Sequence, residues 1–235
     1  MDTDELATGA DEPALGEAVD LRKWRLPRGR HGLPRELVTR SQRERLLAAV
    51  VRATVENGYE ATTVGDILGE AGVGRESFYE LFADKRECML IAHTILVDDL
   101  EQKVRAVYLQ PGAWVDRVRA ALAATLEWFA GDPIAAKFTM VELAAVGPAS
   151  RARFQSDFTR FVDLLDEGLD EDGPDPAVAR ATSLAVGAAL AQIYEEVLRD
   201  RAAQLPKLLP ELTYEVLVPF LGEKAARAQA KRAEG

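Results

Sequence analysis

An all-α fold is predicted by two features of this 235-residue sequence. Residues 63–90 hold two very short segments of helical apolar periodicity, joined by a Gly-Val-Gly turn. Beyond Leu90, apolar residues recur at helical spacing between Pro and Gly breaks, and the alternating pattern of a strand does not appear. The sequence therefore predicts an N-terminal three-helix unit with a helix-turn-helix, followed by a larger helical domain.

The boundaries of the short helices have local signals. Thr63 is placed to cap the first helix, with Asp66 three residues later to return the bond to the Thr63 backbone. Gly72 ends this helix, and Val73 is an apolar plug that sets the angle to the next helix, which starts near Arg75. A third helix opens at residue 84, where an Asp is followed by Glu three positions on.

The second short helix is predicted to face outward. Phe78, Leu81 and Phe82 cover its inner side. The residues left outside are Glu76, Ser77, Tyr79 and Glu80. The Tyr79 hydroxyl and the Lys85 ammonium are spaced to reach one phosphate strand, which points to double-stranded DNA.

The string TTVGDILGEAGVGRESFYELFADKRECML resembles the DNA-binding signature of tetracycline-repressor-like (TetR) regulators, with a match from about Ser41 through Leu90. The elements T-T-V, A-G-V, F-Y and F-x-x-K all fall at family spacing. The resemblance implies a phosphate-backbone contact from Thr63 and phosphate anchors at Tyr79 and Lys85. It also implies a groove-facing set, which is Arg75, Glu76, Ser77 and Glu80.

Two positions depart from the family pattern. Gly74 stands where a capping serine is common, and Leu81 stands where a histidine or another polar residue is common. We therefore expect this helix to read few bases. Glu80 has two interpretations, either an acceptor for a cytosine amino group or a solvated glutamate repelled by phosphate.

A scaffold helix is predicted from Ser41 to Asn57, since an apolar stripe recurs there and Gly58 follows as a stop. Arg40 and Arg43 lie at its N-terminal end, which the family directs toward the DNA backbone.

Composition excludes several classes of protein. Cys88 is the single cysteine, so an internal disulfide is excluded, and with only His31 and His93 no Cys/His metal site is expected. No nucleophile or phosphate-loop motif of an enzyme occurs, and no cofactor is expected. The sequence lacks an 18-residue apolar run and its first twenty residues are acidic, so neither a membrane span nor a signal peptide is expected. We therefore expect the protein to lie in the cytoplasm.

The net charge of −10 is unevenly distributed. Residues 1–20 carry seven acidic residues and no basic one, whereas residues 21–45 carry nine Arg and Lys against two Glu. The local basic cluster matters more for DNA than the total, because exposed charges more than about 10 Å apart are screened at ordinary salt.

The basic segment, part of an N-terminal extension over residues 1–36, is too rich in Pro and Gly for a helix. Pro27-Arg28-Gly29-Arg30 resembles the core of an AT-hook, although His31 replaces the final proline. Three interpretations stay open: a minor-groove arm led by Arg28 and Arg30, a basic tail that adds phosphate contacts only, and packing against the body.

Deletion of residues 1–34, or Arg28→Ala combined with Arg30→Ala, is expected to weaken operator binding. It should also flatten the dependence of the binding constant on salt, by about 0.9 in slope for each lost phosphate contact. Binding titrations at several salt concentrations measure both effects. An unchanged affinity and slope would show that the arm takes no part.

The sequence divides into a DNA-binding domain at 37–86, a helical ligand-binding and dimerisation domain at 87–221 and a polar tail at 222–235 that is expected to fray. The helices expected in the second domain are 84–109, 113–130, 133–146, 149–169, 176–201 and 206–221.

The last two of these helices are too apolar all round for one face to lie in water. The resemblance implies that they pair with their copies in a second subunit as a four-helix bundle. The predicted interface residues are Leu184, Ala188, Ala191, Leu212, Val216 and Phe220. Burial within one subunit is the alternative.

Seven of the sixteen aromatic residues fall between positions 110 and 165, where the resembling family holds a small ligand. The predicted contacts of an unknown, largely apolar effector are Trp114, Trp128, Phe138, Glu142 and Phe158. Core packing is the alternative for each aromatic, and a surface or ion-paired role is the alternative for Glu142.

The expected function is that of a ligand-responsive repressor, acting as a homodimer on a palindromic operator. The alternative is a family member without sequence-specific DNA binding that acts through protein partners, which Leu81 and the outward glutamates permit.

Overall fold

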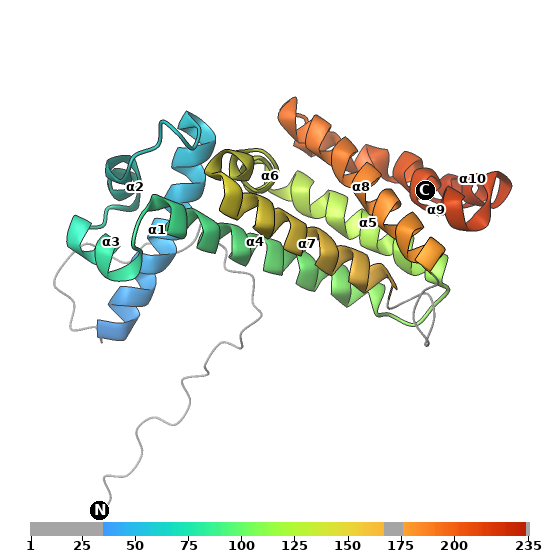
Figure 1. The fold of residues 1–235 in the computed structure, drawn as a ribbon, viewed down its shortest axis with the longest axis horizontal. Helices are drawn as coiled ribbons and strands as arrows, with labels where there is room; N and C mark the ends of the chain where they lie inside the picture. The colour runs from blue at the N-terminus through green and yellow to red at the C-terminus, as the bar shows by residue number, and fades with distance from the viewer. Residues whose placement is uncertain (1–34, 167–175, 234–235) are drawn as a thin grey trace, which may run out of the picture.

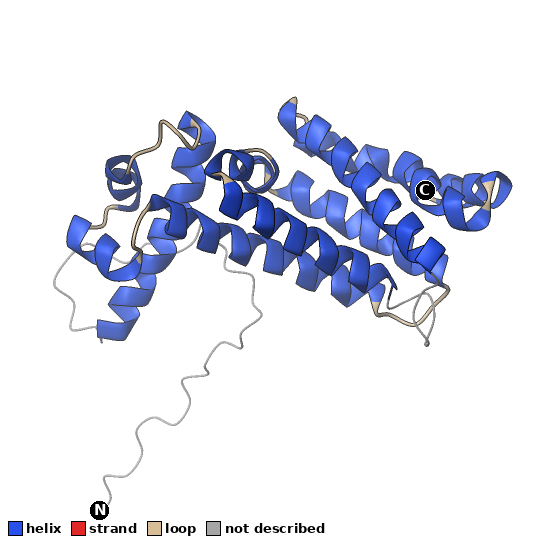
Figure 2. Cartoon of the chain, viewed as in Figure 1, coloured by secondary structure: helices blue, strands red, loops and turns tan. Residues whose placement is uncertain are grey.

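Helices joined by short turns form the part of the chain that the structure, a computed structural model, describes, namely residues 35–166 and 176–233 (Figure 1, Figure 2). The elements are α1 (Arg35–Asn57), α2 (Val64–Ala71), α3 (Arg75–Leu81), α4 (Lys85–Tyr108), α5 (Trp114–Gly131), α6 (Pro133–Met140), the 3₁₀ turn η1 (Glu142–Val146), α7 (Pro148–Asp166), α8 (Pro176–Leu198), the 3₁₀ turn η2 (Ala202–Leu208), α9 (Leu209–Leu221) and α10 (Glu223–Arg232). Within these residues no strand occurs, which confirms the all-α prediction.

The local signals of the helix-turn-helix act as predicted. Thr63 Oγ1 accepts a hydrogen bond from the Asp66 N–H at 3.2 Å, and the Thr63 N–H donates to Asp66 Oδ2 at 2.8 Å. Gly72 has φ +61° and its N–H donates to the Leu68 carbonyl, so the chain turns where glycine carries no steric cost. Arg45 Nη1 also donates to the Gly72 carbonyl at 3.5 Å, which ties the turn to α1.

Helices α1 to α3 gather at one end of the molecule around a small core (Figure 1). Ile67, Phe78 and Phe82 are fully or almost fully buried there, against the apolar side of α1. Burial of this side is what makes the seven-residue α3 stable, because so short a helix is not stable alone in water.

Helix α4 leaves this unit and runs along the body beside α7 (Figure 1). Its first turns contribute Cys88, Met89 and Ala92 to the core of the DNA-binding end, and its later turns contribute Leu100 and Val104 to the core of the body. One continuous helix therefore belongs to both cores.

The segment α6–η1 also joins the two cores. Ala136 packs in the core of the body, whereas Phe138, Leu143 and Val146 pack in the core of the DNA-binding end. A domain boundary placed at about residue 86 therefore leaves out residues of α6 and η1 that complete the core of the DNA-binding end.

Several predicted element boundaries were wrong. Helix α1 begins at Arg35 rather than Ser41, because Arg35, Glu36, Leu37 and Arg40 in its first turns are good helix formers although no apolar stripe marks them. The single helix expected at 133–146 breaks after Met140 into a 3₁₀ turn, which ends at Gly147 with φ +95°. The last long helix begins at Leu209 rather than Pro206, after η2.

The tail expected to fray instead forms α10 over Glu223–Arg232. Ala226 is completely buried, and Arg227 pairs with Glu223 at 2.7 Å while its guanidinium lies 5.3 Å from the centre of the Tyr214 ring. Packing on α9 stabilises this helix, and the polar sequence of the tail does not predict that packing. The arm residues Arg28 and Arg30 lie outside the described residues.

Candidate nucleic-acid interface and internal cavity

The outer surface of α3 carries the side chains that the sequence predicted to face DNA. Arg75, Glu76, Tyr79 and Glu80 are exposed, while Phe78 on the opposite side is completely buried. Tyr79 is 51% exposed and its ring meets the ring of Phe78 edge-on at 5.3 Å, which holds the hydroxyl outward.

Two other residues of α3 face the scaffold rather than open solvent. Ser77 is half-buried, and its hydroxyl accepts a long hydrogen bond from Gln42 Nε2 on α1 at 3.4 Å. Leu81 is half-buried against the core of the DNA-binding end, so this departure from the family pattern has a packing role.

Other predicted phosphate contacts lie on the surface of α1 and at the start of α2. Thr63 is exposed, and its hydroxyl donates to Asp66 Oδ2 at 2.7 Å. Arg43 is exposed, and Arg40 pairs with Glu44 at 3.1 Å on the surface of α1. Such an exposed pair is worth at most about 1 kcal/mol, so it does not prevent Arg40 from reaching a phosphate.

Lys85 is half-buried and bonded within the chain. Its Nζ donates to the carbonyls of Tyr59 at 2.6 Å and Thr62 at 2.7 Å, and it lies 4.3 Å from the centre of the Tyr59 ring. The ammonium thus fixes the connection between α1 and α2 to the start of α4, and a phosphate contact requires it to give up these bonds.

Charge on the folded DNA-binding domain does not by itself favour DNA. Residues 35–86 carry eight Arg and Lys against nine Asp and Glu. Attraction to phosphate therefore depends on particular positions, and Arg43 and Arg75 are among the exposed ones.

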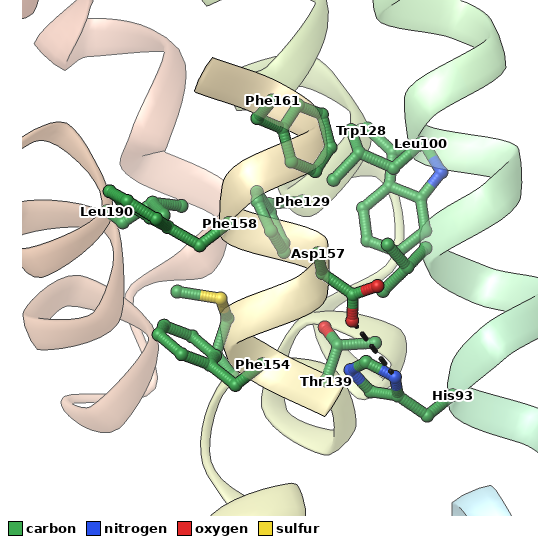
Figure 3. Close-up of a pocket in the computed structure, with 12 residues that line it drawn as sticks. His93, Leu100, Trp128, Phe129, Thr139, Phe154, Asp157, Phe158, Phe161 and Leu190 are labelled. Carbon is green, nitrogen blue, oxygen red and sulfur yellow. Dashed lines mark ion pairs between the residues drawn. The ribbon is translucent and has the colours of Figure 1, made fainter. Parts of the chain in front are cut away.

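An apolar cavity lies in the body between α4, α5, α6, α7 and α8 (Figure 3). The space between atoms there amounts to about 470 Å³, open solvent included, and Trp128 and Phe158, two of the residues expected to contact an effector, are in its wall. A second hollow of about 640 Å³ shares Leu100, Phe161 and Leu190 with the first, so the two adjoin.

Three predicted effector contacts lie elsewhere. Trp114 packs edge-on against Phe220 at 5.2 Å and lines neither hollow, and Phe138 is completely buried in the core of the DNA-binding end. Glu142 Oε2 accepts a hydrogen bond from the Tyr59 N–H at 3.2 Å, so this carboxylate joins η1 to the end of α1. The structure does not bring these three residues to the two hollows, because the rotation of each helix about its axis decides which side chains meet.

Sequence reasoning missed the polar end of the cavity, which is formed by His93 and Asp157. His93 Nδ1 lies 3.7 Å from Asp157 Oδ2, and the two side chains are 4% and 9% exposed. Burial lowers the pKa of His93 to about 4, with a further contribution from Arg153, whereas burial raises the pKa of Asp157.

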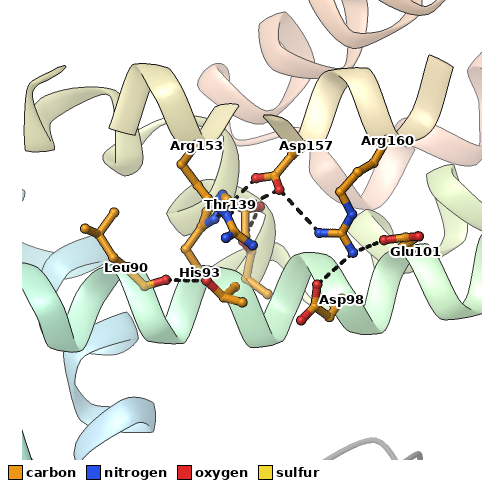
Figure 4. A network of polar contacts seen from close by, with 10 residues as sticks. Leu90, His93, Asp98, Glu101, Thr139, Arg153, Asp157 and Arg160 are labelled. Atoms are coloured by element: carbon orange, nitrogen blue, oxygen red, sulfur yellow. Dashed lines mark hydrogen bonds and ion pairs between the residues drawn. The ribbon is translucent and has the colours of Figure 1, made fainter. Parts of the chain in front are cut away.

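A polar network extends from this pair along α7 and α4 (Figure 4). Asp157 Oδ1 lies 3.3 Å from Arg153 Nε and 3.5 Å from Arg160 Nη1. Arg160 also donates to Asp98 at 2.9 Å and to Glu101. The spacing of Asp157 with Arg153 and Arg160 at four and three residues is the signal in the sequence that could have indicated this cluster.

Stability is expected to fall as the pH drops below 6.5. The folded state holds His93 neutral until about pH 4, while the unfolded chain takes up the proton near 6.5, so acid favours unfolding between these values. The slope should approach about 1.4 kcal/mol per pH unit. Urea unfolding of the protein and of His93→Gln between pH 6.5 and 5.5 measures it, and an equal slope in both would contradict the assignment.

The exposed α3, its glycine turn and the α1 scaffold define a helix-turn-helix DNA-binding domain on a helical body with an internal cavity. Residues 46–90 match the family described as bacterial regulatory proteins, tetR family. These residues therefore form a DNA-binding domain of the tetR family.

Solved structures show the same fold. The fatty acid degradation regulator FadR from Bacillus halodurans matches with a TM-score of 0.67 and 19% identity, over 77% of this chain and 96% of that one. FadR from Bacillus subtilis in complex with stearoyl-CoA matches with a TM-score of 0.63 and 19% identity, over 76% of this chain and 97% of that one. A structure described as a putative TetR-family transcriptional regulator from Syntrophomonas wolfei str. Goettingen matches with a TM-score of 0.62 and 16% identity, over 76% of this chain and 95% of that one. No curated protein matches the sequence.

Proposed function

We propose that this protein is a cytoplasmic repressor that binds a palindromic operator as a homodimer and releases it when an apolar effector fills the cavity. The observation that carries the proposal is the outward surface of α3 on a DNA-binding domain whose core is completed by α4 and α6. The same two helices line the cavity, through residues such as Val97 and Met140.

Coupling between the cavity and DNA follows from α6. Thr139 and Met140 line the cavity, the adjacent Phe138 is in the core of the DNA-binding end, and Glu142 bonds to the Tyr59 N–H. An effector that moves α6 by a fraction of an ångström therefore moves α1, and with it the separation of the two copies of α3.

Dimerisation is supported by α8. Leu184 is 73% exposed, and Ala188 and Ala191 are exposed on the same side of the helix. Over Ala177–Leu198 this helix is long and apolar enough to cross a membrane by length and composition, yet only 28% of the window is buried in the chain. We infer that a second copy of the chain covers this apolar face of α8, as partner helices do in helix bundles.

The interface proposed from sequence needs one correction. Leu212 and Val216 pack in the core of their own chain, with 0% and 5% exposure, so they are not available to a partner. Phe220 is half-buried beside Trp114 and stays in the proposed interface with Leu184, Ala188 and Ala191.

Selection of bound fragments from genomic DNA with the purified full-length protein tests the DNA-binding proposal. The expected product is a palindrome whose half-sites lie about 34 Å apart, one helical turn. If no sequence is enriched, sequence-specific binding is wrong and action through protein partners takes its place.

Arg75→Ala combined with Tyr79→Ala is expected to weaken binding to the selected operator at least about tenfold, since one base-edge and one phosphate contact are lost. Arg199→Ala is the matched control, because Arg199 is exposed at the far end of α8 and pairs only with Glu195 and Glu196 in the described chain. Equal affinities of the two variants in a titration would contradict the placement of DNA on α3.

A further inference from the structure

The polar end of the cavity holds two buried atoms without hydrogen bonds. His93 Nδ1 and Asp157 Oδ2 face each other at 3.7 Å, too far for a hydrogen bond, and neither has a hydrogen-bond partner (Figure 3). Asp157 Oδ1 likewise has no hydrogen bond, but it lies at ion-pair distance from Arg153 and Arg160. Buried polar atoms in folded proteins are nearly always paired, so this pair indicates a place for a further polar group.

The size of the gap restricts that group. A single oxygen about 2.8 Å from each atom can bridge them from the side of the cavity, donating a hydrogen bond to Asp157 Oδ2 and accepting one from the N–H at His93 Nδ1. A hydroxyl has both capacities in one atom. Thr139, the other polar residue in the wall, already donates to the Ala135 carbonyl at 2.8 Å.

The surroundings disfavour charge of either sign on the bound group. Burial and Arg153 disfavour a positive charge on His93. A ligand ammonium beside His93 would be disfavoured for the same reasons. Burial raises the pKa of Asp157 although the charges of Arg153 and Arg160 lower it, so burial outweighs both arginines and also opposes a ligand carboxylate at this place. The network as a whole, Arg153 and Arg160 with Asp98, Glu101 and Asp157, sums to one negative charge.

We propose that the effector is an uncharged amphiphile, an apolar chain or ring system with one hydroxyl, whose hydroxyl bridges His93 and Asp157 while its apolar part lies along Trp128, Phe158 and Phe161. The lining of both hollows beyond this pair is almost wholly apolar, and their shared wall allows a long body to extend from the first into the second. This proposal rests on the proposed effector role of the cavity.

A matched series of probes tests the head group. Binding of 1-decanol, decanoate and decylammonium to the full-length protein is measured by titration calorimetry at pH 7.5 without DNA. We expect 1-decanol to bind at least about tenfold more tightly than either charged compound, because only it satisfies both atoms without burying a charge. Equal or tighter binding of decanoate or decylammonium overturns the proposal.

Variants on α7 locate the head group. Asp157→Leu should lower the affinity for 1-decanol about tenfold, whereas Asp157→Asn, which keeps an accepting oxygen, should stay within a few-fold of the unchanged protein. Asp163→Leu is the matched control on the exposed side of the same helix. Equal affinity of Asp157→Leu and Asp163→Leu for 1-decanol overturns the bridging role. Should Asp157→Leu fail to fold, His93→Phe replaces it with the same expected loss.

Separate measurement of operator release keeps the two proposals distinct. Tight binding of 1-decanol without release of operator DNA supports the hydroxyl site and contradicts the repressor mechanism. Release of DNA by decanoate but not by 1-decanol supports effector control through the cavity and overturns the hydroxyl class.

Discussion

Leu184→Arg is expected to convert the proposed dimer to a monomer and to weaken operator binding by about 100-fold or more. Leu184 is 73% exposed in the middle of the apolar face of α8, so in a dimer it is buried and an arginine there would place two unpaired guanidinium groups in the interface. Loss of the second subunit removes the bivalent attachment to the two half-sites. Light scattering at micromolar concentration measures the mass, and an operator titration measures the affinity.

Leu109→Arg is the matched control for this experiment. Leu109 is 53% exposed at the end of α4, where a basic side chain is compatible with the helix dipole. Its variant should remain a dimer with normal affinity for the operator. A wild-type protein that is already monomeric, or a Leu184→Arg variant that stays dimeric, would contradict the α8 interface.

Phe138→Ala is expected to lower the free energy of unfolding by about 3–5 kcal/mol. Phe138 belongs to α6 in the chain but is completely buried in the core of the DNA-binding end, where its removal leaves a cavity beside α1 and α4. DNA binding should therefore fall together with stability, although the residue is remote from α3 in the sequence. Urea unfolding followed by circular dichroism gives the stability.

Phe154→Ala is the control with the same change in chemistry. Phe154 is 48% exposed on α7, so about 1 kcal/mol or less of hydrophobic stabilisation should be lost. If Phe138→Ala costs no more than Phe154→Ala, the packing of α6 into the DNA-binding end is wrong.

The helix-turn-helix could be predicted closely from sequence because its signals act over three or four residues. The capping box of Thr63 and Asp66 and the left-handed Gly72 need no distant partner to form. The outward side of α3 followed from the spacing of Phe78 and Phe82 alone, since helical periodicity fixes which residues share a side.

The cavity could be predicted only in part. An excess of aromatics at 110–165 indicated an apolar interior, and Trp128 and Phe158 do line it. The pattern offered no means to separate them from Trp114 and Phe138, because all four are large apolar residues on amphipathic helices. His93 and Asp157 were missed since each is unremarkable until α4 and α7 pack together.

The sequence by itself therefore determined the helical class, the DNA-binding motif and the outward surface of α3, all of which depend on interactions between near neighbours along the chain. The tertiary structure alone decided that α6 completes the first core, that Glu142 bonds to Tyr59, 83 positions away, and that Leu212 and Val216 are buried in the core of their own chain. The physical reason is that contacts between helices depend on their crossing and on their rotation about their axes, and periodicity does not specify either.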